Sequence, residues 1–181
     1  MADDIDAWAG DQRARAAADA RVRERWLRQQ AVEGADLHGL LLGLAEKAEQ
    51  VVVGLTNRRR HQGTVTGVGI DVVTLGGRAG QRVHVAIGAI ASVQAGPQTS
   101  GRPDAGAARR GPQTGRLAHV LADEATERPR VVLGLEGGET VSGELCAVGT
   151  DVLTVHADGD TGGTVYVRLG SVCDASFFGS G

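Results

Sequence analysis

The sequence contains few aromatic residues and a single lysine, Lys47. Aromatic side chains make up 3% of the 181 residues, and the formal net charge is −3. Single-stranded nucleic acid is commonly bound by stacking its bases on aromatic rings, so a stacking platform is not expected here. Because the chain is not strongly basic as a whole, nucleic-acid binding would require a local basic patch.

Cysteine and long apolar runs are also scarce. Cys146 and Cys173 are the only cysteines, and they lack Cys-x-x-Cys spacing, which favours two buried reduced thiols. No apolar run is long enough to span a bilayer, and the acidic start at residues 1–6 lacks a signal-peptide core. These features predict a cytoplasmic location without membrane association, and the residue usage is typical of a GC-rich bacterial genome.

The sequence motifs of common enzymes are missing. It contains neither a Gly-x-Ser-x-Gly elbow nor a phosphate-binding loop, and its five histidines are scattered. The glycine-rich segment 76–80 lies between two predicted strands, which favours a hairpin loop over a phosphate cradle. We therefore expect no enzyme activity, catalytic residue, cofactor, metal site or small-molecule substrate.

The main feature that is present is an internal repeat. Residues 63–75 recur as residues 143–155 at a constant shift of 80 positions. The residues of the first copy that are identical in the second are Gly63, Val68, Gly69, Asp71, Val72 and Thr74. Each copy is rich in β-branched residues on either side of a glycine, which predicts a strand, a tight turn and a second strand.

The turn residues occur at the same places in both copies. Gly69 and Gly149 lie where the chain must reverse, and glycine accepts a positive φ without a steric penalty. Asp71 and Asp151 follow two residues later, and their carboxylates are expected to hydrogen bond to backbone NH groups of the turn. We interpret these four residues as structural rather than catalytic.

The repeat extends in both directions. Residues 51–55 match 131–135, and residues 83–90 match 165–172, which adds further short strands to each copy. Apolar residues at helical spacing precede the strands, from Leu37 to Ala48 and from Leu117 to Ala125. Each copy is therefore predicted to be one helix followed by five short strands that form a small barrel.

A helix that leads into five short, bent strands, with a Gly-to-Asp turn between the second and third, resembles the Sm-like fold. Other small SH3-like barrels fit the same pattern. The predicted fold class is mainly β with helices: two tandem Sm-like units and an N-terminal helical arm. The resemblance implies association with RNA and assembly through edge strands.

Composition sets the expected boundaries. We predict an N-terminal helical arm at 1–35, a first helix-plus-barrel domain at 36–95, a flexible linker at 96–114 and a second such domain at 115–178. The linker holds three of the four prolines and has no hydrophobic period. The arm is rich in arginine, including Arg21, Arg25 and Arg28, and is either a solvated helix packed on the first barrel or a docking arm.

One loop differs in charge between the copies. Residues 56–61 contain Arg58, Arg59 and Arg60, whereas the matching residues 136–140 contain two glutamates. The difference fits drift at solvated loop tips, contacts from the arginines to phosphates, or charge steering between chains. We therefore hypothesise a non-catalytic regulatory module that binds RNA or DNA through this loop and the arm. The alternative is a protein-interaction and assembly adaptor that binds no nucleic acid.

Overall fold

The computed structural model describes residues 36–96, 115–159 and 162–178. Its contacts divide the chain into two units, Met1–Leu40 and Leu41–Gly181. The first unit is described only from Asp36, whose Oδ1 accepts a hydrogen bond from the Gly39 backbone N–H at 2.6 Å. The predicted arm, with Arg21, Arg25 and Arg28, and nearly all of the predicted linker lie outside the described residues.

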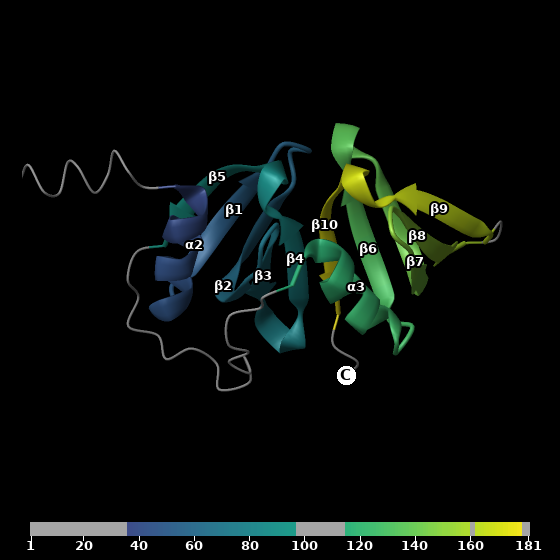
Figure 1. Ribbon diagram of the computed structural model, residues 1–181, viewed down its shortest axis with the longest axis horizontal. Coiled ribbons are helices and arrows are strands. Elements are labelled where there is room, and N and C mark those ends of the chain that lie inside the picture. Colours follow the sequence, from purple (N-terminus) through teal and green to yellow (C-terminus); the bar gives the residue numbers. More distant parts are fainter. Residues whose placement is uncertain (1–35, 97–114, 160–161, 179–181) are drawn as a thin grey trace, which may run out of the picture. The chain divides into compact units, whose positions relative to one another are not determined.

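The first half of the described chain contains one helix and five strands (Figure 1). Its elements are α2 (Leu37–Glu46), β1 (Gln50–Leu55), β2 (Arg60–Val68), β3 (Val72–Gly76), β4 (Arg82–Ala86) and β5 (Ile90–Ala95), with 3-10 turns η1 (Arg78–Gly80) and η2 (Ile87–Ala89). The helix and the strands occur in the predicted order.

The second half has the same succession of elements. They are α3 (Leu117–Ala125), β6 (Arg130–Leu135), η3 (Glu136–Gly138), β7 (Thr140–Val148), β8 (Val152–Ala157), β9 (Thr164–Arg168), η4 (Leu169–Ser171) and β10 (Val172–Phe177). None of the described helices is long and apolar enough to cross a membrane.

All ten strands belong to one antiparallel sheet with the order β5-β1-β2-β3-β4-β10-β6-β7-β8-β9. This confirms the mainly β class. The sheet is open, with β5 and β9 at its ends, and it runs through both halves instead of forming two separately closed barrels. The reason is that β4 of the first half pairs with β10 of the second (Figure 1).

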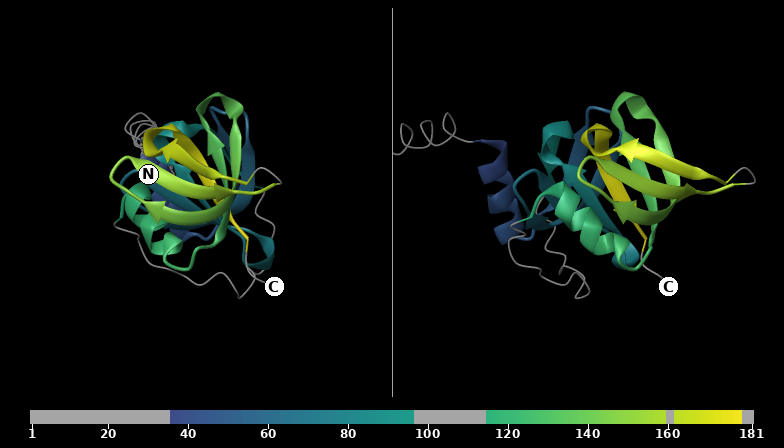
Figure 2. Two further views of the ribbon diagram at one scale, coloured as in Figure 1. Left: turned by 90° about the vertical axis from the view of Figure 1, so that its right-hand side faces the viewer. Right: turned by 45° about the vertical axis from the view of Figure 1, so that its right-hand side comes forward.

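Strand pairing follows the same register in both halves. Gln50 pairs with Thr64 in the first half, and Arg130 pairs with Glu144 in the second, a shift of 80 for both partners. The register shift in the β2–β3 pair recurs at the matching residues of the β7–β8 pair. The register shift in the β1–β5 pair likewise recurs in the β6–β10 pair. Bulges of this kind bend strands, and the strands of both halves are visibly curved (Figure 2).

The hydrophobic core of the second half includes one residue from the first. Leu121 of α3 and Leu133, Leu145 and Leu153 of the strands are fully buried together, and Val72 of β3 belongs to the same cluster. The helix α3 packs against β7 of its own half and also against β4 (Figure 2). Burial of the α3 apolar face therefore depends on both halves.

Candidate functional site: the junction between the two halves

The junction is built on the backbone pairing of β4 with β10. Asp174 lies opposite Val85, Ala175 opposite His84, and Phe177 opposite Arg82. The His84 and Phe177 rings meet edge to face, with centroids 5.5 Å apart and an interplanar angle of 61°. Backbone hydrogen bonds between strands form with almost any sequence, so the side chains at this junction determine which strand pairs with which.

A buried carboxylate lies at one end of the junction. Asp174 is 0% exposed, and Asn57 Nδ2 donates a hydrogen bond to its Oδ1 at 3.2 Å. Arg59 Nη1 and His61 Nε2 each lie 3.1 Å from its Oδ2. Neither nitrogen is aligned with Oδ2 as a hydrogen-bond donor, so the Arg59 guanidinium interacts with Asp174 mainly through its charge. Three residues around the first β-hairpin thus surround one acid of the second half.

The backbone of β6 leaves room for this cluster. A Cβ atom at Gly134 would collide with Asp174 Oδ1 and with the Arg59 guanidinium. Only glycine fits there without displacing the ion pair, because any side chain begins with that Cβ atom. The same loop contacts Cys173, the residue of β10 that precedes Asp174. Burial raises the pKa of the Cys173 thiol, and a hydrogen bond with Thr56 opposes this with a smaller effect.

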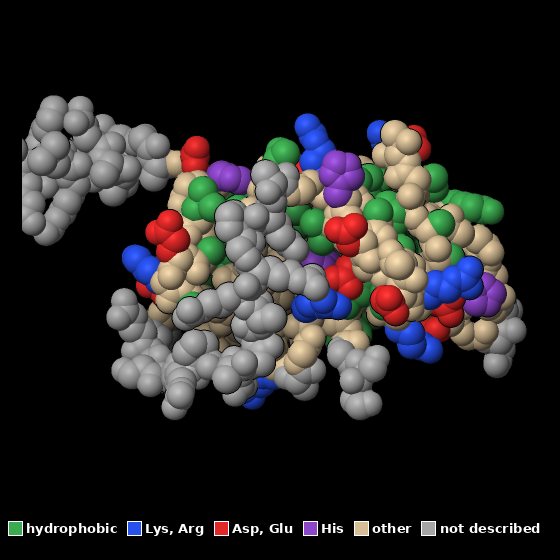
Figure 3. All heavy atoms as spheres, turned by 60° about the horizontal axis from the view of Figure 1, so that its bottom comes forward, with side chains coloured by type: hydrophobic (Ala, Val, Ile, Leu, Met, Phe, Trp, Pro, Cys, Tyr) green, Lys and Arg blue, Asp and Glu red, His purple; other side chains and the backbone are tan. Residues whose placement is uncertain are grey.

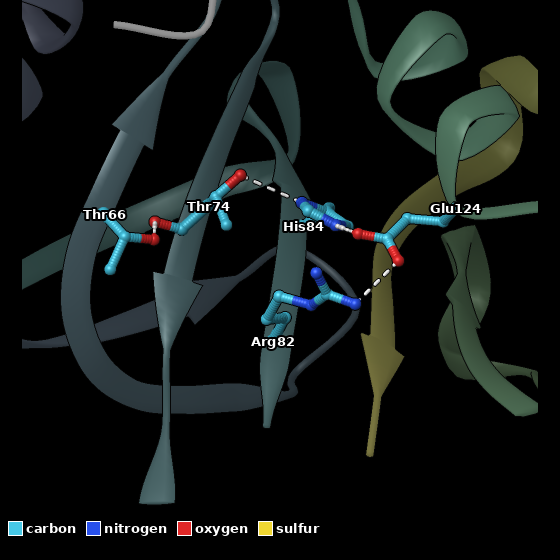
Figure 4. Close-up of polar contacts among 5 residues, drawn as sticks. All are labelled: Thr66, Thr74, Arg82, His84 and Glu124. Atoms are coloured by element: carbon cyan, nitrogen blue, oxygen red, sulfur yellow. Dashed lines mark hydrogen bonds and ion pairs between the residues drawn. The ribbon is translucent and has the colours of Figure 1, made fainter. Parts of the chain in front are cut away.

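A second polar chain crosses the junction towards α3 (Figure 4). Thr74 Oγ1 lies 2.9 Å from His84 Nδ1, and His84 Nε2 lies 3.4 Å from Glu124 Oε1. Arg82 Nη2 donates a hydrogen bond to Glu124 Oε2 at 2.8 Å. A hydroxyl, an imidazole and a carboxylate in sequence can support nucleophilic catalysis. Here Thr74 is 5% exposed and His84 is 1% exposed, and the contacts link β3, β4 and α3.

The β2–β3 turn of the first half caps α3 of the second. The Leu117 backbone N–H donates a hydrogen bond to Asp71 Oδ1 at 2.6 Å, and the Ile70 N–H donates to the Gly115 carbonyl at 3.0 Å. The residue before the helix, Arg116, makes no side-chain cap of its own. Asp71 therefore supplies a helix cap across the junction, and its negative charge suits the helix N-terminus.

The four predicted turn residues do not all act alike: the two glycines have the same backbone contacts, whereas the two aspartates differ. Gly69 N–H donates to the Val72 carbonyl and Gly149 N–H donates to the Val152 carbonyl, so both turns close in the same way. Neither glycine has a positive φ, contrary to the sequence-based expectation. Among the described residues Asp151 makes no side-chain hydrogen bond, because no second helix lies beside its turn.

The three loop arginines differ in environment. Arg59 is drawn into the junction and its side chain is only 27% exposed. Arg58 and Arg60 are exposed, and within the described part of the chain neither forms an ion pair. On the face drawn in Figure 3, blue basic and red acidic side chains are interspersed, without a broad basic area among the described residues. Of the three arginines in the predicted phosphate-binding loop, Arg58 and Arg60 are thus the two with exposed side chains.

Sequence reasoning missed Asn57, His61, Asp174, Arg82, His84 and Glu124 as parts of one region. A signal was available in the differences between copies. Asp174 corresponds to Ser92, and Glu124 corresponds to Leu44, so each acid is found in only one half. At these two positions the difference between the copies coincides with different neighbours.

Comparisons with protein-family models, with curated proteins and with solved structures found no match. Within the described ranges, no group of three or more His, Cys, Asp and Glu residues is arranged to hold a metal ion. The function must therefore be argued from the junction and from the sheet edges.

Proposed function

We propose that this chain is a non-catalytic assembly module made of two Sm-like units, which joins further copies of itself by pairing its open edge strands. The observation that supports the proposal most strongly is the β4–β10 junction, where two copies of one unit already associate edge to edge. The strand orders β5-β1-β2-β3-β4 and β10-β6-β7-β8-β9 are equivalent, as two Sm-like units require.

The two strands at the ends of the sheet, β9 and β5, correspond to the two strands that pair at the junction. By alignment of the halves, β9 is the counterpart of β4, and β5 is the counterpart of β10. Unpaired edge strands carry free backbone donors and acceptors that favour pairing with another chain. Head-to-tail pairing of β9 with β5 of a second copy would repeat the geometry of the junction.

The side chains at these edges are compatible with such pairing. Tyr166 of β9 corresponds to His84 and is 72% exposed, and Ala95 of β5 corresponds to Phe177. A large ring would face a small residue between chains, whereas two rings of similar size meet at the junction within the chain. A contact between non-equivalent surfaces of this kind forms rings or filaments rather than symmetric dimers.

Sedimentation of the full chain over a concentration series tests this proposal. Wild-type mass is expected to rise with concentration, whereas Tyr166→Lys on β9 and Ala95→Lys on β5 should each keep the mass of one chain. Tyr166→Phe is the matched control and should associate as the wild type does. An equimolar mixture of the two lysine variants should give a species of two chains, since each retains one functional edge.

A wild-type mass that stays at one chain at every concentration would exclude the second copy as the partner. A stoichiometric complex with a different protein, lost in Tyr166→Lys, would then identify β9 as an adaptor edge for another chain. Retention of that complex by both lysine variants would contradict edge pairing altogether.

A second candidate function is binding of RNA or DNA through Arg58 and Arg60, assisted by Arg21, Arg25 and Arg28. The observation that favours it is the backbone of Arg58, which has φ +68°, a region that costs a non-glycine residue about 1–2 kcal/mol. The corresponding Gly138 has φ +91°. Retaining arginine where glycine is better suited is consistent with a use for its charge.

Nucleic-acid shift measurements across a salt series test this second candidate. Arg58→Gly with Arg60→Ala should weaken binding and reduce the salt slope by about 1 for each lost phosphate contact. Arg78→Ala, at an exposed arginine of the same half, is the control for loss of an arginine charge outside this loop. Equal binding by the wild type and the double variant would exclude this loop as a phosphate contact.

A further inference from the structure

The buried acid of the junction has no equivalent in the first half. Asp174 lies opposite Gly134 in the β10–β6 pair, and Ser92 lies opposite Gly54 in the β5–β1 pair. A Cβ atom at Gly54 would lie 2.6 Å from Ser92 Oγ, so the serine side chain occupies the place that the aspartate occupies in the second half. The two last strands therefore present different groups at the same position.

The loop that receives the acid also differs. In the first half it offers Asn57, Arg59 and His61, which we call the acid socket. The corresponding residues of the second half are Gly137, Glu139 and Val141, which offer neither a positive charge nor an amide. The acid socket is therefore present beside β4 only, and its acid is present on β10 only.

These differences make two of the four edge combinations unfavourable. If β5 of another copy replaced β10 beside β4, Ser92 would face the acid socket and Arg59 would be partly buried without a carboxylate. If β9 of another copy paired with β10, Glu139 would approach Asp174 and two acids would be brought together. Partly buried charges without a partner, and like charges in contact, both oppose association.

We infer that Asp174 and the acid socket determine strand choice: they match β10 with β4 and exclude the β5 edge of another copy. Placement of an ionic group to select one pairing over its alternatives is an established use of buried polar residues. The remaining edges, β5 and β9, lack both parts of this device. The inference concerns pairing within one chain and does not depend on assembly of whole chains.

Neighbouring contacts are consistent with this selection. The Glu124 carboxylate on α3 faces Arg82 and His84, which lie on β4. The corresponding residues on β9 are Thr164 and Tyr166, which carry no charge that could meet an acid. A chain that presented β9 to the β10–α3 surface would therefore leave Glu124 without its arginine as well as placing Glu139 near Asp174.

Hydrogen exchange on the full chain tests the inference locally. In Asp174→Ser, which installs the residue of the first half, amide exchange in β4 and β10 should rise at least tenfold. Amides of β7 and β8 are the internal reference, and their exchange should rise less than that of β4 and β10. Unchanged exchange in β4 and β10 would overturn the inference. Should Asp174→Ser fail to fold, the isosteric Asp174→Asn gives the same readout.

Moving the acid tests selection rather than stability. The double variant Ser92→Asp with Asp174→Ser places the acid on β5, so β4 of one chain should now pair with β5 of another. In the Tyr166→Lys background, in which β9–β5 pairing is blocked, its sedimentation mass should exceed that of Tyr166→Lys alone at equal concentration. Adding Arg59→Met should abolish the excess, because the acid socket has lost its charge. An excess mass that persists without Arg59, or no excess at all, would overturn the inference.

The outcomes separate this inference from the proposed function. Edge pairing between wild-type chains is reported by the Tyr166→Lys variant, which leaves Asp174 and the acid socket intact. Exchange in β4 and β10 is a property of a single chain. Sedimentation can therefore contradict the proposed assembly while hydrogen exchange supports the inference on strand choice. The opposite combination of results can be recognised as well.

Discussion

The two halves of the molecule share a register but differ in the chemistry around their first hairpins. In the first half, Asn57 and Arg59 reach a buried acid of the other half. In the second half, the matching loop consists of Glu136, two glycines and Glu139, and all four residues are exposed to solvent. The comparison teaches that a duplicated fold can keep its backbone geometry while its contact residues diverge according to what each copy faces.

The largest expected effect concerns the acid that only one half has. Asp174→Ala should destabilise the fold by about 3–5 kcal/mol, because it leaves the Arg59 charge partly buried without its partner. Ser92→Ala at the equivalent exposed position should change stability by less than about 0.5 kcal/mol. Denaturant unfolding of both variants measures the contrast, and equal effects would remove the distinction between the halves.

The two turn aspartates should differ next. Asp71→Ala removes the cap on the Leu117 N–H and should cost about 1 kcal/mol. Asp151→Ala should have little effect, because Asp151 makes no side-chain hydrogen bond among the described residues. Thermal unfolding can compare the pair. A cost at Asp151 equal to that at Asp71 would show that both act on their own turns.

The hairpin backbone gives a smaller contrast of opposite sign. Arg58→Gly should stabilise the chain by about 0.5–1 kcal/mol, since glycine adopts φ +68° without a steric penalty. Arg60→Gly serves as a control at a position without positive φ and should destabilise β2 instead. Loss of stability in Arg58→Gly would mean that the Arg58 side chain makes a stabilising contact.

The smallest effect distinguishes the two thiols. Cys173 is 1% exposed and Cys146 is half-buried, so Cys146 should be alkylated first in the native state. Burial raises the pKa of Cys173 above its usual 9.0, which means that its neutral form stabilises the fold below about pH 9. This contribution is lost as the pH rises through the higher folded value. Mass spectrometry of labelled peptides over a pH series checks both the order and the trend.

Much of the secondary structure follows from the repeat and from its periodicity. The alternation of Val83, Val85 and Ile87 predicts a strand, which the structure has as β4, although Ile87 itself falls in the turn η2. The apolar spacing around Leu41 and Leu121 predicts α2 and α3. The continuous sheet was not predictable in the same way. The pairing of β4 with β10 joins segments about 90 residues apart, and local periodicity carries no information on which edges meet.

The candidate site was predicted only in part. The unusual charge of the Arg58–Arg60 loop was visible in the sequence, but its consequence was not, because Arg59 and His61 have their partner in the last strand. Thr74 and His84 likewise appear unrelated to Glu124 in sequence order. Each of these contacts exists only after two strands from different halves have paired.

By itself the sequence determined that this protein is mainly β and that its two halves follow one pattern of helix and strands, because hydrophobic period and glycine placement act over a few residues. Only the tertiary structure decided that the halves share one open sheet and that an acid from the second half enters a hairpin of the first. Contacts of that kind depend on which edges meet in space, and no local property of the chain specifies such a meeting.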